Sequence, residues 1–133
     1  MSNEETLQLG AVSPKPVTDD DLKNALKSVA LESPSYVYTS PEWMEPGTDR
    51  CYYVHHARGD EGMLACGCMV GVALHSLGVP LAALKEWEAC SASAVLMEFF
   101  PNASDEVRAA YTTAQIRQDR GLPWGVAIRG LDL

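Results

Sequence analysis

The chain has 133 residues, of which 47% are hydrophobic and 21% charged, and this composition predicts one globular domain with a hydrophobic core of its own. The formal net charge is −8 and the ten basic residues are scattered, which argues against a nucleic-acid partner because phosphate binding needs clustered Lys and Arg. No apolar run is long enough to span a membrane and the first residues are acidic and polar, so we expect a cytoplasmic protein without a membrane partner.

The first 17 residues predict a flexible acidic tail. They combine acidic residues with Pro14 and Pro16 and show no sustained hydrophobic period. The remaining residues, 18–133, are expected to form the single globular domain.

A helix is predicted to begin after Thr18. Asp21 lies three residues further on, which forms a short capping box, and Pro34 ends the pattern. One apolar stripe follows at helical spacing: Leu22, Ala25, Leu26, Val29 and Ala30.

Two short β-prone runs follow, at residues 36–38 and 51–55, and they are separated by a Pro-containing loop. The simplest interpretation is an antiparallel pair that packs on a helix, since two strands alone are marginally stable in water. A third strand is possible at residues 62–65, after the turn at 58–62.

Residues 66–77 predict a central buried helix, because the segment has no charged side chain apart from what His75 carries. Gly67 and Gly71 each cost about 1 kcal/mol relative to alanine in a helix interior, so we expect a neighbouring element to approach them closely. The other predicted helices are 80–87, 91–100, 104–120 and a short one at 124–131. The predicted fold class is therefore α+β and mainly helical, with about five helices and a small two- or three-stranded antiparallel sheet.

Cysteine and histidine residues are concentrated between residues 51 and 68. A zinc site formed by Cys51, His55, Cys66 and Cys68 is one interpretation, although a C-x-C pair that enters an apolar helix differs from the usual zinc spacing. Packing is the other interpretation, because free cysteine is among the most frequently buried residues. We favour packing and expect no metal and no cofactor.

A thiol enzyme is the related alternative. A cysteine at a helix N-terminus has its thiolate favoured by the helix dipole, but catalysis needs a base histidine, usually on a later strand. After residue 68 the only histidine is His75, within the same segment. We therefore expect a protein that is not an enzyme.

An acidic regulator with a helix-turn-helix is a further alternative. Residues 81–87 and 91–97 have suitable lengths, but residues 91–100 contain no basic side chain to present to bases. An ordinary helical hairpin is the preferred interpretation.

The favoured function is a protein-binding module without catalytic activity. Trp43 and Met44 lie in a Pro-containing loop, where exposure would mark an interface, because aromatic and Met side chains are enriched at interfaces. Glu86 and Glu88 belong to an acidic surface that suits a basic patch on a protein partner.

Two segments resemble motifs of small uncharacterised proteins encoded by phages of actinobacteria. Residues 68–80 match the pattern C-x-V-G-x-x-L-x-x-L-G-V-P, and residues 114–127 match A-Q-x-x-Q-D-x-G-x-x-W-G-x-A. The similarity covers about residues 20–128, and Cys66 stands where a small or polar residue is usual. The resemblance implies a phage protein outside the virion that modulates a host factor in the host cytoplasm.

The later motif also has a structural interpretation. Gly121 suits a left-handed helix C-cap, and Gln115, Gln118 and Asp119 are polar groups expected to satisfy a buried turn or to face a partner.

Overall fold

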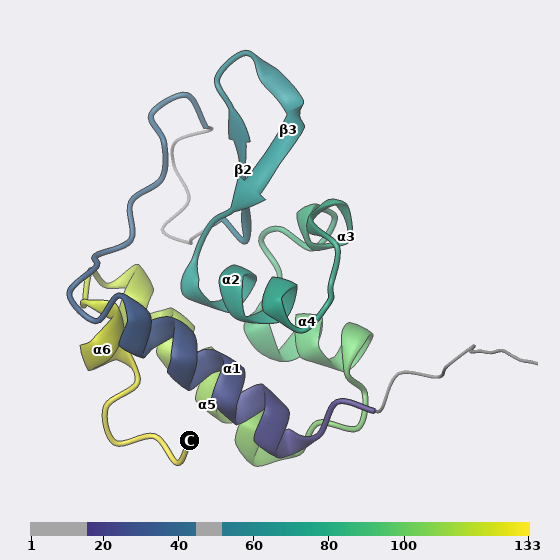
Figure 1. The fold of residues 1–133 in the computed structure, drawn as a ribbon, viewed down its shortest axis with the longest axis vertical. Helices are drawn as coiled ribbons and strands as arrows, with labels where there is room; N and C mark the ends of the chain where they lie inside the picture. Colours follow the sequence, from purple (N-terminus) through teal and green to yellow (C-terminus); the bar gives the residue numbers. More distant parts are fainter. Residues whose placement is uncertain (1–15, 45–51) are drawn as a thin grey trace, which may run out of the picture.

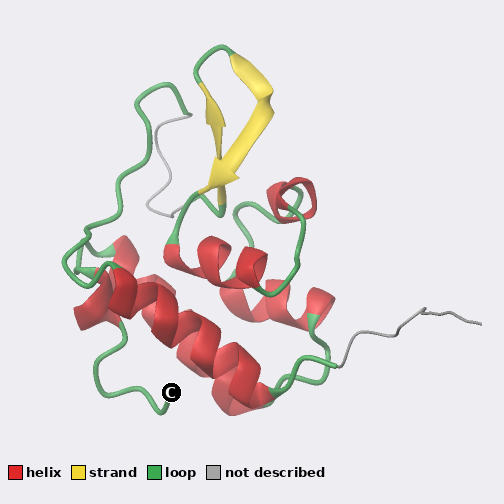
Figure 2. Ribbon diagram, in the orientation of Figure 1, coloured by secondary structure: helices red, strands yellow, loops and turns green. Residues whose placement is uncertain are grey.

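The structure is a computed structural model that describes residues 16–44 and 52–133. This part of the chain contains six helices and one two-stranded antiparallel sheet (Figures 1 and 2). The helices are α1 (Asp19–Glu32), α2 (Met69–Ser76), α3 (Leu81–Lys85), α4 (Ala92–Phe99), α5 (Asp105–Asp119) and α6 (Trp124–Ala127), and the strands are β2 (Val54–Ala57) and β3 (Asp60–Cys66). The predicted α+β fold, mainly helical with a small antiparallel sheet, is confirmed.

Helix α1 begins as its capping chemistry predicts. The hydroxyl of Thr18 accepts the N–H of Asp21 at 3.2 Å, and the Asp21 carboxylate accepts the N–H of Thr18 at 2.9 Å. The inward face buries Leu22, Leu26, Val29 and Ala30. Of the predicted tail, only residues 16 and 17 lie within the described part of the chain.

The helices form a body in which α2 contacts α1, α5 and the strand β3. Helices α1 and α5 both pack against α2, while α4 lies on α5, and α6 contacts α5 and α1 (Figure 1). The core includes Leu26, Met69 and Leu96, and the buried Tyr111 hydroxyl donates to the carbonyl of Leu22 at 2.6 Å. Within the described residues, none of the helices combines the length and the apolar character that membrane crossing requires.

The sheet is a β-hairpin that stands out from the helical body (Figures 1 and 2). Its register pairs Val54 with Cys66, His55 with Ala65 and His56 with Leu64. The predicted pairing of residues 36–38 with residues 51–55 is therefore wrong. Strand β2 pairs instead with the segment that follows it, because the short turn through Gly59, at a φ of +77°, closes a local hairpin at a small entropic cost.

The segment at 36–38 is extended but forms no strand. The Tyr36 carbonyl accepts the N–H of Trp124 at 2.9 Å, and the two rings meet edge to face with centroids 4.7 Å apart. At Tyr36 this segment is therefore bound to α6 and is not paired with a strand.

The predicted helix at 66–77 is shorter at its start than expected, because Cys66 ends β3 and Cys68 is the N-cap of α2. The expected close approach is confirmed at both glycines. A Cβ at Gly71 would lie 2.1 Å from the Tyr53 carbonyl oxygen, and one at Gly67 would lie 2.1 Å from that of Tyr52. The first turns of α2 thus pack backbone to backbone on the segment that leads into the hairpin.

The later predicted helices also end earlier than expected. Helix α3 stops at Lys85, and the chain then turns through Ala89, whose φ of +67° is left-handed. Helix α6 ends at Ala127. The predicted left-handed C-cap is confirmed by Gly121, which has a φ of +90°.

Candidate functional site

A pocket of about 190 Å³ lies at the base of the hairpin, between the two strands, the end of α3 and the loop at 41–44. We call it the hairpin pocket. Five titratable side chains line it beside three apolar ones: Met44, Tyr52, Val54, His55, His56, Leu64, Lys85 and Glu88. The titratable groups come from elements far apart in the sequence, so only the folded chain assembles them.

Glu88 lies in the connection between α3 and α4 and binds the backbone at the start of β2. Its two carboxylate oxygens accept the N–H groups of Tyr53 at 2.9 Å and Val54 at 3.0 Å. The Tyr53 hydroxyl in turn donates to the carbonyl of Cys90. Burial raises the pKa of Glu88 to about 7, although the two N–H groups and the charge of Lys85 act to lower it.

Tyr38 contacts β2 and the residue before Tyr53. Its hydroxyl lies 2.7 Å from Nε2 of His55, and it accepts the N–H of Tyr52 at 3.0 Å. Burial lowers the pKa of His55, and the neighbouring charge of His56 lowers it further. The imidazole of His55 is therefore held in its neutral form near pH 7.

Trp43 has the exposed position expected of a partner-binding residue. Its side chain is 43% exposed, and its indole N–H donates to the carbonyl of His56 at 2.8 Å. This bond also occupies one acceptor on the outer edge of β2. Met44, by contrast, is 8% exposed and lines the hairpin pocket, so the exposure that would mark an interface is present at Trp43 and not at Met44.

The two predicted glutamates differ in position. Glu88 is half-buried and engaged with the backbone of β2, as described above, so its carboxylate is not presented to solvent as a free acidic group. Glu86 is exposed at the end of α3. The structure thus places Met44 and Glu88 in the lining of one pocket, and Trp43 is bonded to His56, which also lines it. Glu86 is close by in the chain. Lys85, His56 and Leu64 also belong to this pocket, and no local sequence signal marks them.

The proposed zinc ligands are placed as follows. Cys51 lies outside the described residues, and the described part of the chain contains no group of three or more His, Cys, Asp or Glu side chains suited to hold a metal ion. Cys68 is fully buried, and Cys66 is half-buried with its pKa raised by that burial. His75, expected within a buried helix, is exposed on α2, and its Nδ1 lies 3.0 Å from the carbonyl oxygen of Val79.

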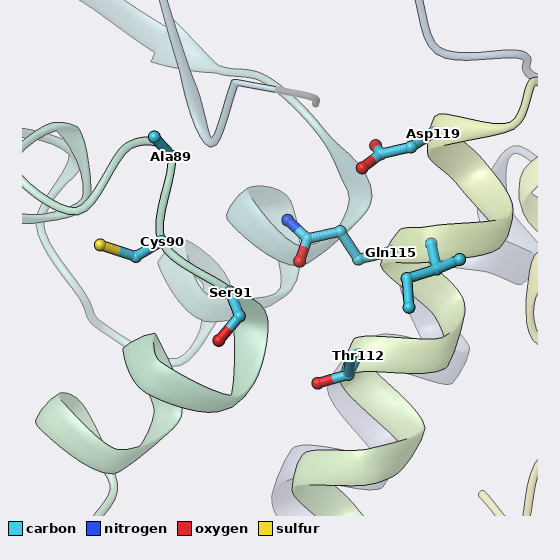
Figure 3. A pocket seen from close by; sticks show the side chains of 7 residues that line it. Ala89, Cys90, Ser91, Thr112, Gln115 and Asp119 are labelled. Atoms are coloured by element: carbon cyan, nitrogen blue, oxygen red, sulfur yellow. The ribbon is translucent and has the colours of Figure 1, made fainter. Parts of the chain in front are cut away.

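A second pocket, of about 200 Å³, separates the connection at Ala89–Ser91 from α5 (Figure 3). Gln115 and Asp119 extend from α5 toward this connection, whereas Cys90 points away from α5. Gln115 Oε1 accepts the N–H of Ala92 at 3.1 Å and so helps to cap α4. This pocket is therefore bordered by groups that already serve the backbone.

Gln118 has a similar structural role, because its Oε1 accepts the N–H of Met69 at 2.9 Å in the first turn of α2. Of the two alternatives given for the late motif, Gln115 and Gln118 thus follow the first, since each accepts a buried backbone N–H. The predicted helical hairpin corresponds to α3 and α4. Helix α3 has only five residues, and α4 carries no basic side chain.

No protein-family model, curated protein or solved structure matches this chain. The resemblance to actinobacterial phage proteins therefore stays a prediction, and the function has to be argued from the geometry of the hairpin end.

Proposed function

We propose that this protein is a protein-binding module whose partner contacts the hairpin end of the molecule, at Trp43 and the hairpin pocket. The observation that carries the proposal is the exposed indole of Trp43, fixed by its hydrogen bond to His56. Tryptophan is enriched among the residues that dominate binding energy at interfaces. An indole that is already held in place loses little conformational entropy when a partner covers it.

The surroundings of Trp43 support an interface with mixed chemistry. Met63 on β3 is 63% exposed and adds apolar area at the same end of the molecule. Glu42, Glu61 and Glu86 are exposed acidic groups on three of the four segments that line the pocket. A partner that places basic groups around an apolar anchor complements this surface.

The sequence resemblance to phage proteins extends the proposal to the biological setting. In that setting the partner is a host protein in the host cytoplasm, and the chain modulates it by binding rather than by catalysis. This part of the proposal depends on the two sequence motifs and not on the geometry of the pocket.

The proposal is tested by affinity capture from an actinobacterial lysate, using the tagged protein and quantitative mass spectrometry. Wild-type protein and a Met97→Ala control should retain the same partner, since Met97 is also exposed, at 58%, but lies on α4. Trp43→Ala should lose it. Trp43→Phe keeps an aromatic anchor but lacks the donor to His56, so intermediate retention is expected.

Circular dichroism of each variant confirms that it is folded before capture is compared. A partner retained equally by wild-type protein and Trp43→Ala would contradict the proposed interface. So would the absence of any specific partner across host lysates.

A further inference from the structure

An open groove of about 320 Å³ runs between α1 and α2. Its lining residues on α1 recur every three or four positions and form one stripe along the helix: Asp21, Asn24, Ala25, Ser28, Val29 and Glu32. The facing wall is formed by Val72, Ser76 and Leu77. From Asp21 to Glu32 the stripe extends about 16 Å, which is three helical turns. We call this feature the α1–α2 groove.

The centre of the α1–α2 groove is apolar. Ala25, Val72 and Leu77 are partly buried and continue the hydrophobic core to the surface. Ser28 and Ser76 are exposed on the two walls, and their small side chains allow another helix to approach closely. The groove therefore has the apolar floor and low walls of a surface that receives a helix.

The charges along the α1–α2 groove have one sign. None of the described residues that line it is basic, and its two ends carry the carboxylates of Asp21 and Glu32. Helical geometry places Lys23 and Lys27 on the opposite side of α1, where Lys23 approaches Asp132 at 3.7 Å.

The Glu32 end of the groove is negative. Glu32 forms no ion pair with any described residue, and the last turn of α1 contains no basic side chain. The backbone carbonyls at a helix C-terminus add partial negative charge to this end. Positive charge on a ligand is thus favoured at both ends of the groove, with apolar contact between them.

We propose that the α1–α2 groove binds an amphipathic helix of a protein partner, one that carries Lys or Arg near both ends and aliphatic side chains on the face between them. The inference rests on the proposed function, because it names the kind of segment through which a protein partner is bound. It concerns a surface separate from Trp43, so the two can be tested independently.

The direct test uses a synthetic alanine-based helix of about four turns, with leucines along one face and lysines at both ends. Binding of the fluorescein-labelled peptide to the full chain is measured by anisotropy. We expect binding that weakens as salt is added, because exposed ion pairs are screened. A scrambled peptide of the same composition, whose leucines no longer share a face, should bind at least about tenfold more weakly.

Protein variants locate the site. The double variant Asp21→Asn/Glu32→Gln removes both carboxylates and should weaken binding at least about fivefold, while Asn at 21 keeps an acceptor for the helix cap. Ser28→Arg places a long cationic side chain in the groove and should abolish binding. The control Glu98→Gln/Glu106→Gln removes the same charge from α4 and α5 and should change affinity less than about twofold.

Equal effects of the two double variants would overturn the proposal, because the peptide would then respond only to net charge. Failure of the probe helix to bind would overturn it as well. If the groove variants still retain the captured partner while Trp43→Ala loses it, the groove proposal fails and the proposed function stands. If only the groove variants lose that partner, the binding function stands and the hairpin end is not its site.

Discussion

Replacing Gly71 with alanine is expected to destabilise the protein, although the same change stabilises most helix interiors. The added Cβ would lie 2.1 Å from the carbonyl oxygen of Tyr53, 2.9 Å from its carbonyl carbon and 3.0 Å from its Cα. These are backbone atoms, so no change of rotamer relieves the clash. The Tyr53 backbone is also held on both sides, since its N–H binds Glu88 at 2.9 Å and its carbonyl accepts the N–H of Gly67 at 2.9 Å.

The magnitude follows from two opposing contributions. Alanine is favoured over glycine in a helix interior by about 1 kcal/mol. Forcing an extra carbon into a packed contact costs about 1–3 kcal/mol. Here the upper end applies, because α2 and the segment at 52–53 have to separate by about 1 Å to relieve the contact. The expected net loss is about 2 kcal/mol in the free energy of unfolding, and more if the hydrogen bonds to Glu88 are also broken.

Urea denaturation followed by circular dichroism measures this loss. Gly62→Ala is the control, because Gly62 lies on the exposed strand β3 and its added Cβ would meet only the Asp60 carboxylate, at 3.4 Å. We expect the control to stay within about 0.5 kcal/mol of wild type. A Gly71→Ala protein as stable as wild type, or more stable, would refute the backbone contact between α2 and the start of the hairpin.

Three further predictions concern single side chains. Ala89→Gly should raise the free energy of unfolding by about 0.5–1 kcal/mol, because glycine relieves the left-handed φ of +67°, and a lower melting temperature would contradict this. Gln118→Ala leaves the buried N–H of Met69 without its acceptor and should cost about 1–3 kcal/mol in urea denaturation; an unchanged midpoint would show that the bond is dispensable. Burial raises the pKa of Glu88 to about 7, so its stabilising contribution is complete below its unfolded-state pKa of 4.5 and is lost as the pH rises through about 7. Between about pH 5 and 8 the free energy of unfolding of the wild-type protein should fall by about 1–2 kcal/mol relative to that of Glu88→Gln. This is less than the full pKa shift implies, because the side chain is partly solvated. The lowered pKa of His55 makes the free energy of unfolding rise with pH, and this contribution is the same in both proteins, so it cancels in the comparison. A difference in free energy of unfolding between the two proteins that does not vary with pH would refute the effect of burial on Glu88.

Local chemistry explains which parts of the fold could be predicted from the sequence. The start of α1 was predictable because Thr18 and Asp21 satisfy each other's N–H groups within one turn. The same holds for α5, where the Ser104 hydroxyl accepts the N–H of Val107 at 3.2 Å. The contact at Gly71 was predictable because glycine is unfavourable relative to alanine in a helix interior, so its presence indicates that a neighbouring element occupies the space of a side chain.

Long-range contacts explain the predictions that failed. Tyr36 was expected in a strand, but its carbonyl is bound by Trp124, and nothing near residue 36 in the sequence indicates that partner. Met44 was a candidate partner-binding residue on the condition that it is exposed, yet it is buried and lines the hairpin pocket. Glu88 was selected as a surface charge, and its partners lie 34 and 35 residues away in the chain. The hairpin pocket could be predicted only in part for the same reason, since its lining comes from four separate segments.

The attachments of the hairpin imply that it opens more easily than the helical body unfolds. Its base is buried at Tyr53 and Val54, but most of β3 is exposed, and the outer edge of β2 is held by the indole of Trp43 and the carboxylate of Glu88. Segments held by few and exposed contacts open locally at a smaller free energy than the core. Amide hydrogen exchange should therefore be faster in β3 than in α2, and a partner that covers Trp43 should slow exchange in β3 while leaving α2 unchanged. Equal protection of β3 and α2 in the free protein would show instead that the hairpin and the body unfold as one unit.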